Sequence, residues 1–205
     1  MAKIKLTKGE LKRQRDALKQ FKRYLPTLQL KKQQLQLEIL QQNLILQEKI
    51  LALSKKRQAI NSWIGLLNNS AIDLKPFLKP EKIITHTKNI AGVDISVFDT
   101  MDFGSSEYDL FAMPLWLDLA IEAFREVVIL NQEILIYETG ITVLRQELRI
   151  TTQRVNLFEK VKIPSAEENI RLIKIYIGDQ MANAVGRCKI AKRKIEALIL
   201  EEALV

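Results

Sequence analysis

The sequence predicts an all-α-dominated fold, a long antiparallel two-helix coiled-coil hairpin with a short middle region that contains a small β-hairpin. Three observations lead to this prediction. The 205 residues include only 7 Gly and 5 Pro, so few residues interrupt helices. Apolar residues recur every seven positions in both outer parts of the chain. Three of the five prolines lie between residues 68 and 114, which places the shorter elements there.

The first predicted element is a coiled-coil helix over residues 7–68. Thr7 and Glu10 have the spacing of a capping box, which predicts a helix start near Lys8. An apolar row then recurs every seven residues as far as Leu67. Its seam residues include Leu11, Leu18, Leu25, Ile39, Leu46 and Leu53. A further row widens the apolar face and predicts packing against more than one neighbour; its members are Leu30, Leu37, Leu44 and Leu51.

The middle region, residues 69–113, predicts a short globular part instead of a long helix. β-Branched residues alternate in Ile83–Thr87 and again in Val93–Val97. The five residues between these segments, 88–92, end in glycine and favour a turn. We therefore expect a small β-hairpin here.

Residues 114–203 predict a second coiled-coil helix, which starts around Pro114. Its heptad row is displaced by one residue near Pro164, which predicts a kink. Ser165 and Glu168 have capping-box spacing, so a full break is the alternative, and we favour a kinked continuous helix. Pro26 predicts a kink in the first helix as well. The predicted seam residues of the second helix are Ile134, Ile141, Leu148, Val155, Phe158, Ile170 and Ile177.

The formal net charge of +8 is compatible with a nucleic acid, an anionic membrane or an acidic protein as partner. Antiparallel pairing of the helices would place residues 8–23 beside residues 187–194, and both segments are basic. No aromatic residues alternate with these charges as in single-strand nucleic-acid sites, so we do not expect nucleic-acid binding. The residues of this expected basic end are Lys8, Lys12, Arg13, Arg15, Lys19, Arg187, Lys189, Lys192, Arg193 and Lys194.

The sequence offers no set of residues for catalysis, for a cofactor or for a metal ion. His86 is the single histidine and Cys188 the single cysteine, so neither a triad nor a ligand set is indicated. A phosphate-binding glycine loop is also missing. Without a signal-peptide pattern or a long uncharged apolar stretch, we expect a cytoplasmic chain that does not insert into the membrane.

Segments spread along nearly the whole chain are similar to a known family. The sequence TTQRVNLFE at residues 151–159, followed by Ile163-Pro164, resembles the D subunit of the V/A-type ATPases. Residues 11–18 and 89–95 resemble two further stretches of that family. Gln153 and Asn169 depart from the family pattern, which has arginine and threonine there. The motif residues carried over by the resemblance are Arg154, Val155, Asn156, Glu159 and Pro164.

The resemblance implies a non-catalytic rotor shaft in a central stalk. Such a shaft couples ATP synthesis or hydrolysis to proton or sodium transport by rotation, and it is peripherally associated with the membrane through its complex. The implied partners are the A and B subunits of the catalytic ring, the F subunit, and the rotor-capping subunit of the C/d type. Two alternatives from the residue patterns alone are an unrelated coiled-coil scaffold or tether and a basic nucleic-acid-binding hairpin.

Overall fold

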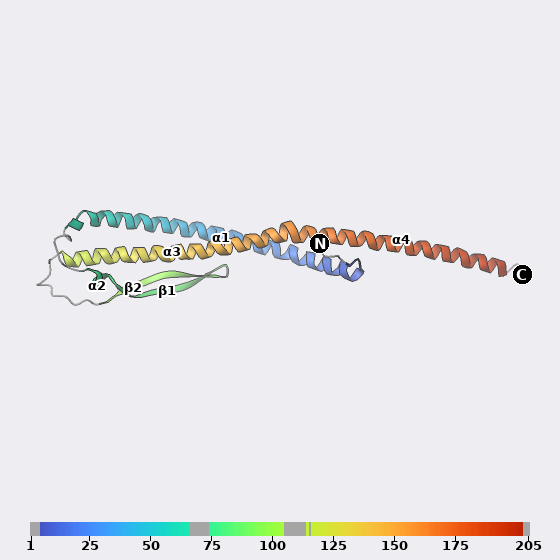
Figure 1. Cartoon of the computed structure of the whole chain (residues 1–205), viewed down its shortest axis with the longest axis horizontal. Coiled ribbons are helices and arrows are strands. Elements are labelled where there is room, and N and C mark those ends of the chain that lie inside the picture. Colours follow the sequence, from blue (N-terminus) through green and yellow to red (C-terminus); the bar gives the residue numbers. More distant parts are fainter. Residues whose placement is uncertain (1–4, 66–73, 105–113, 115, 203–205) are drawn as a thin grey trace. The chain divides into compact units, whose positions relative to one another are not determined.

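The computed structural model describes residues 5–65, 74–104, 114 and 116–202 (Figure 1). It has two compact units. The first combines the chain up to Gln29 with the chain from Thr152 onward, and the second is Leu30–Thr151. The division crosses both long helices. The predicted element boundaries at residues 68, 69, 113 and 203 lie outside the described residues.

Helix α1 (Lys8–Asn61) begins where the capping-box spacing predicts. The hydroxyl oxygen of Thr7 accepts a hydrogen bond from the backbone N–H of Glu10 at 3.3 Å, which satisfies one of the free donors of the first turn. The helical conformation continues through Pro26. There the hydroxyl of Thr27 donates to the carbonyl of Tyr24 at 2.8 Å, a local bond of the kind that serine and threonine make in helices.

The second helical run consists of α3 (Leu117–Leu157), the π-helical turn η2 (Phe158–Lys162) and α4 (Ile163–Glu202). It starts at Leu117, three residues after Pro114, and the N–H of Leu117 donates to the carbonyl of Pro114 at 3.0 Å. No break separates α3 from α4, and a π turn marks the position of the register shift.

The hairpin consists of β1 (Pro80–Ile90) and β2 (Val93–Phe103), which pair antiparallel. Both strands are longer than the sequence predicted, and the turn is only Ala91-Gly92. These two residues have φ of 52° and 79°, as a two-residue hairpin turn requires. The side-chain oxygen of Asn89 accepts from the N–H of Gly92 at 3.1 Å and holds this turn. Residues 88–90, expected in the turn, thus belong to β1. A four-residue helix, α2 (Lys75–Leu78), precedes the hairpin.

The core of the second unit forms where the hairpin packs on α1 and α3. It joins three elements, with further contacts from Ile90, Ala91 and Leu148. The side chain of Leu144 on α3 is fully buried in it. The core residues are Leu35, Ile39, Val93, Ile95 and Leu144. Because α1 and α3 both contribute, the hairpin adds a third layer to the coiled-coil seam in this unit.

Ion pairs join α1 to α3 in the second unit. In each of these pairs, the lysine belongs to α1 and the glutamate to α3. Their Nζ to Oε distances are 2.9 Å for Lys31–Glu147 and 2.7 Å for Lys49–Glu133, and Lys56 pairs with Glu126 farther along. The partner numbers fall as the lysine numbers rise, so the helices are antiparallel. Such half-exposed pairs add little stability individually. A slip of register would leave these charges unpaired, so the ladder favours one alignment.

The base of the hairpin is attached to α3 by Arg125. Its Nε donates to the carbonyl of Phe77 at 3.1 Å, and its Nη2 donates to the carbonyl of Gly104 at 3.3 Å. The guanidinium carbon also lies 5.0 Å from the centre of the Phe103 ring, within cation–π range. The Arg125 side chain thus binds the backbone both before β1 and after β2.

The first prediction tests this core. Replacing Leu144 by alanine should lower the free energy of unfolding by about 3 kcal/mol, because a fully buried side chain is lost and a cavity remains. Leu135→Ala on the same helix is the matched control; Leu135 is 51% exposed, and its loss should cost at most about 0.5 kcal/mol. Urea unfolding followed by circular dichroism measures both. Equal losses for the two variants would contradict the assignment of the core.

Candidate interaction surfaces

The predicted seam residues all lie at buried or half-buried positions. The seam residues of α1 therefore lie toward the second helical run in each unit. The contacts described above show this for the second unit. The buried members are Ile39, Leu53, Ile141 and Val155, and the half-buried members are Leu11, Leu18, Leu25, Leu46, Ile134, Leu148, Phe158, Ile170 and Ile177. Their burial uses one face of each helix and leaves the other faces open.

The first unit pairs the beginning of α1 with α4. Lys22 Nζ lies 2.7 Å from Glu167 Oε1, and the rings of Phe21 and Phe158 are 5.4 Å apart. Lys8 lines a surface hollow together with Tyr176 and other residues of the same α4 segment. The start of α1 is therefore level with residues 176–184.

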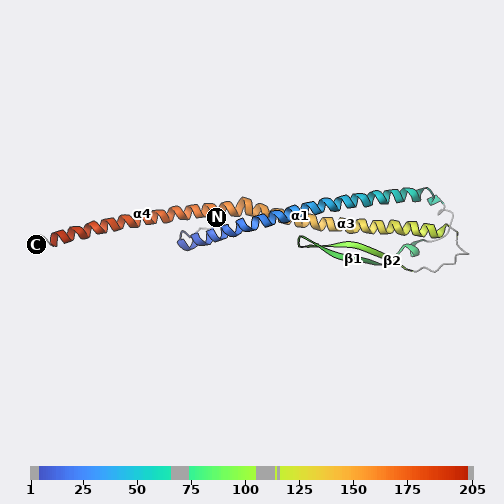
Figure 2. The same cartoon turned by 180° about the vertical axis from the view of Figure 1, so that it is seen from behind.

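This arrangement corrects the expectation that the two basic segments lie side by side. Helix α1 has 54 residues, whereas the second helical run continues from Leu117 to Glu202. In the antiparallel pairing, α1 therefore leaves the last part of α4 without a partner helix. Figures 1 and 2 show α4 continuing past the beginning of α1. We define residues 185–202 as the α4 extension.

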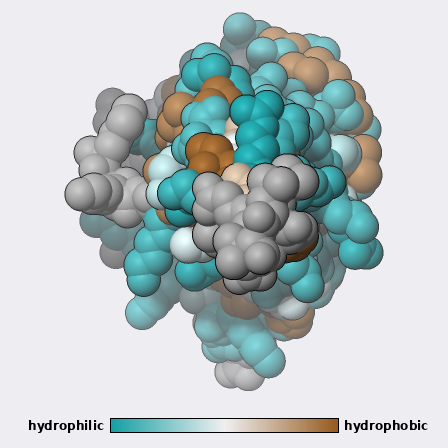
Figure 3. Space-filling model, turned by 90° about the vertical axis from the view of Figure 1, so that its right-hand side faces the viewer, coloured by the Kyte–Doolittle hydropathy of each residue, from teal (hydrophilic) through white to brown (hydrophobic). Residues whose placement is uncertain are grey.

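The basic residues of the predicted end are all exposed, five on α1 and five on the α4 extension. Residues 185–197 of the extension are exposed without exception. They include large apolar side chains as well as charges: Ile190 is 59% exposed and Ile195 56%. Viewed from the C-terminal side, the surface is mostly hydrophilic with separate hydrophobic patches (Figure 3). Cys188 is a free, exposed thiol on this segment.

A second uncovered surface lies on α1 in the second unit, and we call it the leucine stripe. Its members are between 56% and 67% exposed. The heptad rows identified four of them, and the structure adds Leu40, which is three residues from Leu37 and on the same helix face. Leu40 could have been found in the sequence, because it lies three residues after Leu37 and four residues before Leu44. The leucine stripe consists of Leu30, Leu37, Leu40, Leu44 and Leu51.

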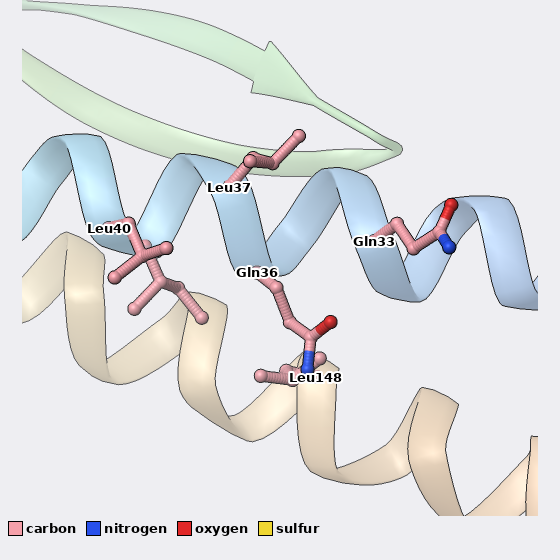
Figure 4. A pocket seen from close by; sticks show the side chains of 6 residues that line it. Gln33, Gln36, Leu37, Leu40 and Leu148 are labelled. Carbon is pink, nitrogen blue, oxygen red and sulfur yellow. The ribbon is translucent and has the colours of Figure 1, made fainter.

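The leucine stripe borders a shallow groove between α1 and α3. Leu37 and Leu40 line it together with Gln33, Gln36 and Leu148. Figure 4 shows Gln36 extending from α1 toward Leu148 on α3, with Leu40 one turn away. The groove therefore offers apolar surface next to amide donors and acceptors.

The family-motif residues surround the π turn. Val155 is buried, whereas Arg154, Asn156, Glu159 and Pro164 are exposed. Just beyond, Arg171 donates two hydrogen bonds to the carboxylate of Glu168, at 2.9 Å and 2.7 Å. These hydrogen bonds, with the charge of the guanidinium, lower the pKa of Glu168 below its ordinary value.

His86, the single histidine of the sequence, lies on strand β1 of the β-hairpin. Its Nδ1 lies 2.7 Å from Oδ1 of Asp99, and both side chains are exposed on the sheet. Within the described residues, no group of three or more His, Cys, Asp and Glu side chains has the arrangement of a metal site. His86 thus lies in a cross-strand pair and in no ligand set.

The helical run Leu117–Ala197 contains an 18-residue window with a mean hydropathy of 1.4, of which 11% is buried. By length and composition alone this window would suffice to cross a membrane. The core helix of a soluble protein meets the same criterion. The helix also contains Glu133, which pairs with Lys49 of α1.

These features define a helical-hairpin protein whose two long helices leave apolar and basic faces uncovered. The family model of the ATP synthase D subunits matches residues 10–193. The chain belongs to this family. It is 45% identical over 195 residues to a V-type ATP synthase D subunit of Borreliella burgdorferi, with 95% of this chain and 96% of the relative covered. A V-type ATP synthase D subunit of Chlamydia caviae is 32% identical over 197 residues, with 95% of each chain covered.

The second prediction concerns the Glu168–Arg171 pair. In the Arg171→Gln variant, the titration midpoint of the Glu168 carboxyl should rise, because the hydrogen bonds and the charge that hold its pKa low are removed. A lowered folded-state pKa stabilises the fold at pH values above the unfolded pKa, and the contribution disappears as the pH falls through the folded value. Carbon-detected NMR titration of the side chain measures the midpoint. An unchanged midpoint would show that the pair does not form in solution.

Proposed function

We propose that the chain is the non-catalytic shaft subunit in the central stalk of a V-type ATP synthase or ATPase. By rotation it couples ATP synthesis or hydrolysis in the ring of A and B subunits to proton or sodium transport in the membrane sector. The observation that carries the proposal is the match to the family of ATP synthase D subunits along nearly the whole helical hairpin. A scaffold or tether unrelated to this family would not account for that match.

The seam supports this role because a shaft must carry torque without slipping. In the second unit, burial of apolar side chains and the lysine–glutamate ladder both favour a single register. Removing any one exposed pair costs little, but a slip would disturb the ladder and the core together.

The α4 extension is our candidate for contact with the A and B subunits. It is exposed along residues 185–197 and carries five of the basic residues together with apolar ones. Long solvated side chains form weak, reversible contacts, which suit a shaft that must visit successive ring positions. Tight binding to a single ring position would trap the rotor.

The leucine stripe is our candidate surface for the F subunit. Five leucines at helical spacing leave more than half of each side chain exposed, next to a groove with Gln33 and Gln36. Patches of this kind on a soluble chain mark interaction sites. We assign the rotor-capping subunit of the C/d type to the end of the hairpin opposite the chain termini.

We further propose that the chain is cytoplasmic and reaches the membrane only through its complex. The apolar window in this helical run is only 11% buried, so packing instead of insertion is supported by the charged pair that this helix makes. A bilayer would have to accommodate Glu133, whose partner Lys49 belongs to α1.

The third prediction tests the α4 extension. Replacing its five basic residues together by glutamine should lower the number of ions transported per ATP hydrolysed by the reconstituted complex. Each single replacement should change ATP turnover at most about fivefold, since an exposed ionic contact contributes about 1 kcal/mol or less. Hydrolysis and ion transport are measured side by side. Loss of all hydrolysis from one exposed substitution in an assembled complex would indicate an active site and refute the shaft assignment.

The fourth prediction tests the leucine stripe. The double variant Leu37→Gln and Leu44→Gln should bind the purified F subunit about tenfold or more weakly, because buried leucines at an interface are replaced by polar side chains. Circular dichroism should be unchanged, since both positions are exposed. Val185→Gln with Ile190→Gln on the α4 extension is the matched control and should leave this binding unaffected. Equal effects of the two pairs in a calorimetric titration would exclude this surface.

A further inference from the structure

The second helical run contains one residue more than its heptad pattern needs. Before the π turn, Thr151 and Val155 are buried; after it, Ala166 and Ile173 are buried. Apolar rows with a spacing of seven residues run on either side of the turn, and Val155 ends one row while Ile163 begins the other, eight residues later. A single extra residue therefore lies between the two parts of the row.

The π turn absorbs this residue. In η2 the N–H of Ile163 bonds to the carbonyl of Phe158, five residues back, where an α-helix bonds four back. Each residue of an α-helix turns the chain by about 100°. Without the wider turn, the helix from Ile163 onward would therefore rotate by that angle, and Ser165 and Leu172 would replace Ala166 and Ile173 on the side facing α1. Burial of the apolar row explains why the turn forms.

Pro164 follows the π turn and fits it. In an unbroken α-helix the residue at this position would donate its N–H to the carbonyl of Lys160, and proline has no N–H to donate. The helix thus gives up regular hydrogen bonds at the place where the extra residue is held. Removing one residue and the proline would leave an unbroken heptad row through Val155, Ile163, Ile170 and Ile177. Folding by itself requires neither feature.

We propose that η2 together with Pro164 is a torsional joint. It twists more easily than the α-helix on either side of it, which serves the rotation of the shaft and lowers the stability of the fold. This inference rests on the shaft function proposed above. Segments with fewer regular hydrogen bonds open more readily than the helix around them, and π turns inside helices are frequent at functional sites. The division between the compact units crosses α3 between Thr151 and Thr152, less than about two helical turns from η2.

The first test uses the isolated chain. The variant that lacks Val161 and carries Pro164→Ala should be more stable than the parent, because Val161 is 54% exposed and the heptad row becomes continuous. We expect a Tm about 3 °C higher and hydrogen exchange at residues 158–164 slowed by about tenfold. The matched control inserts an alanine after Val161 and should lower the Tm, since it adds a second extra residue. A deletion variant less stable than the parent would overturn the proposal.

The second test uses the assembled complex and separates the joint from the function on which it rests. With the parent chain, the complex should hydrolyse ATP and transport ions; failure at this step would refute the proposed function. With the deletion variant, we expect hydrolysis to persist while ions transported per ATP fall by about twofold or more, in line with a stiffer shaft. A folded variant that does not assemble, or that transports as many ions per ATP as the parent, would overturn the joint alone.

Discussion

The register of the antiparallel helix pairing is the constraint on which the remaining structure depends. In the second unit, the same alignment brings Leu35 and Leu144 together, matches the lysines of α1 with the glutamates of α3, and forms the surface on which the hairpin packs. Burial supplies most of the stabilisation, because half-exposed ion pairs add little. The charges act chiefly by disfavouring other alignments.

Because two helices can bury only one stripe on each other, a sequence with wider apolar faces leaves some of them uncovered. The leucine stripe on α1 and the apolar residues of the α4 extension are the result. Their exposure would be a liability in an isolated protein, since contiguous apolar patches promote association. In one member of a larger assembly, the same faces are available to partners. The family to which the chain belongs is one of ATP synthase subunits.

The candidate surfaces were only partly predictable. Heptad counting located the seam residues and four members of the leucine stripe, because helical spacing is visible in a sequence. It misplaced the basic residues: the predicted helices, residues 7–68 and 114–203, already differ in length, and antiparallel pairing of helices of unequal length leaves residues 185–202 without a partner on α1. Arg125 was missed since its acceptors are backbone carbonyls of Phe77 and Gly104, which carry no sequence signal.

The sequence by itself determined the helical hairpin, the capped start of α1, the presence of a β-hairpin and the one-residue displacement of the heptad row near Pro164. All of these follow from local spacing and from residues with restricted backbone geometry. Only the tertiary structure decided that a π turn holds the extra residue, that the hairpin turn is Ala91-Gly92, and that Val93 and Ile95 pack on both helices. Those outcomes depend on which side chains are buried together, and residues distant in sequence are brought together only by folding.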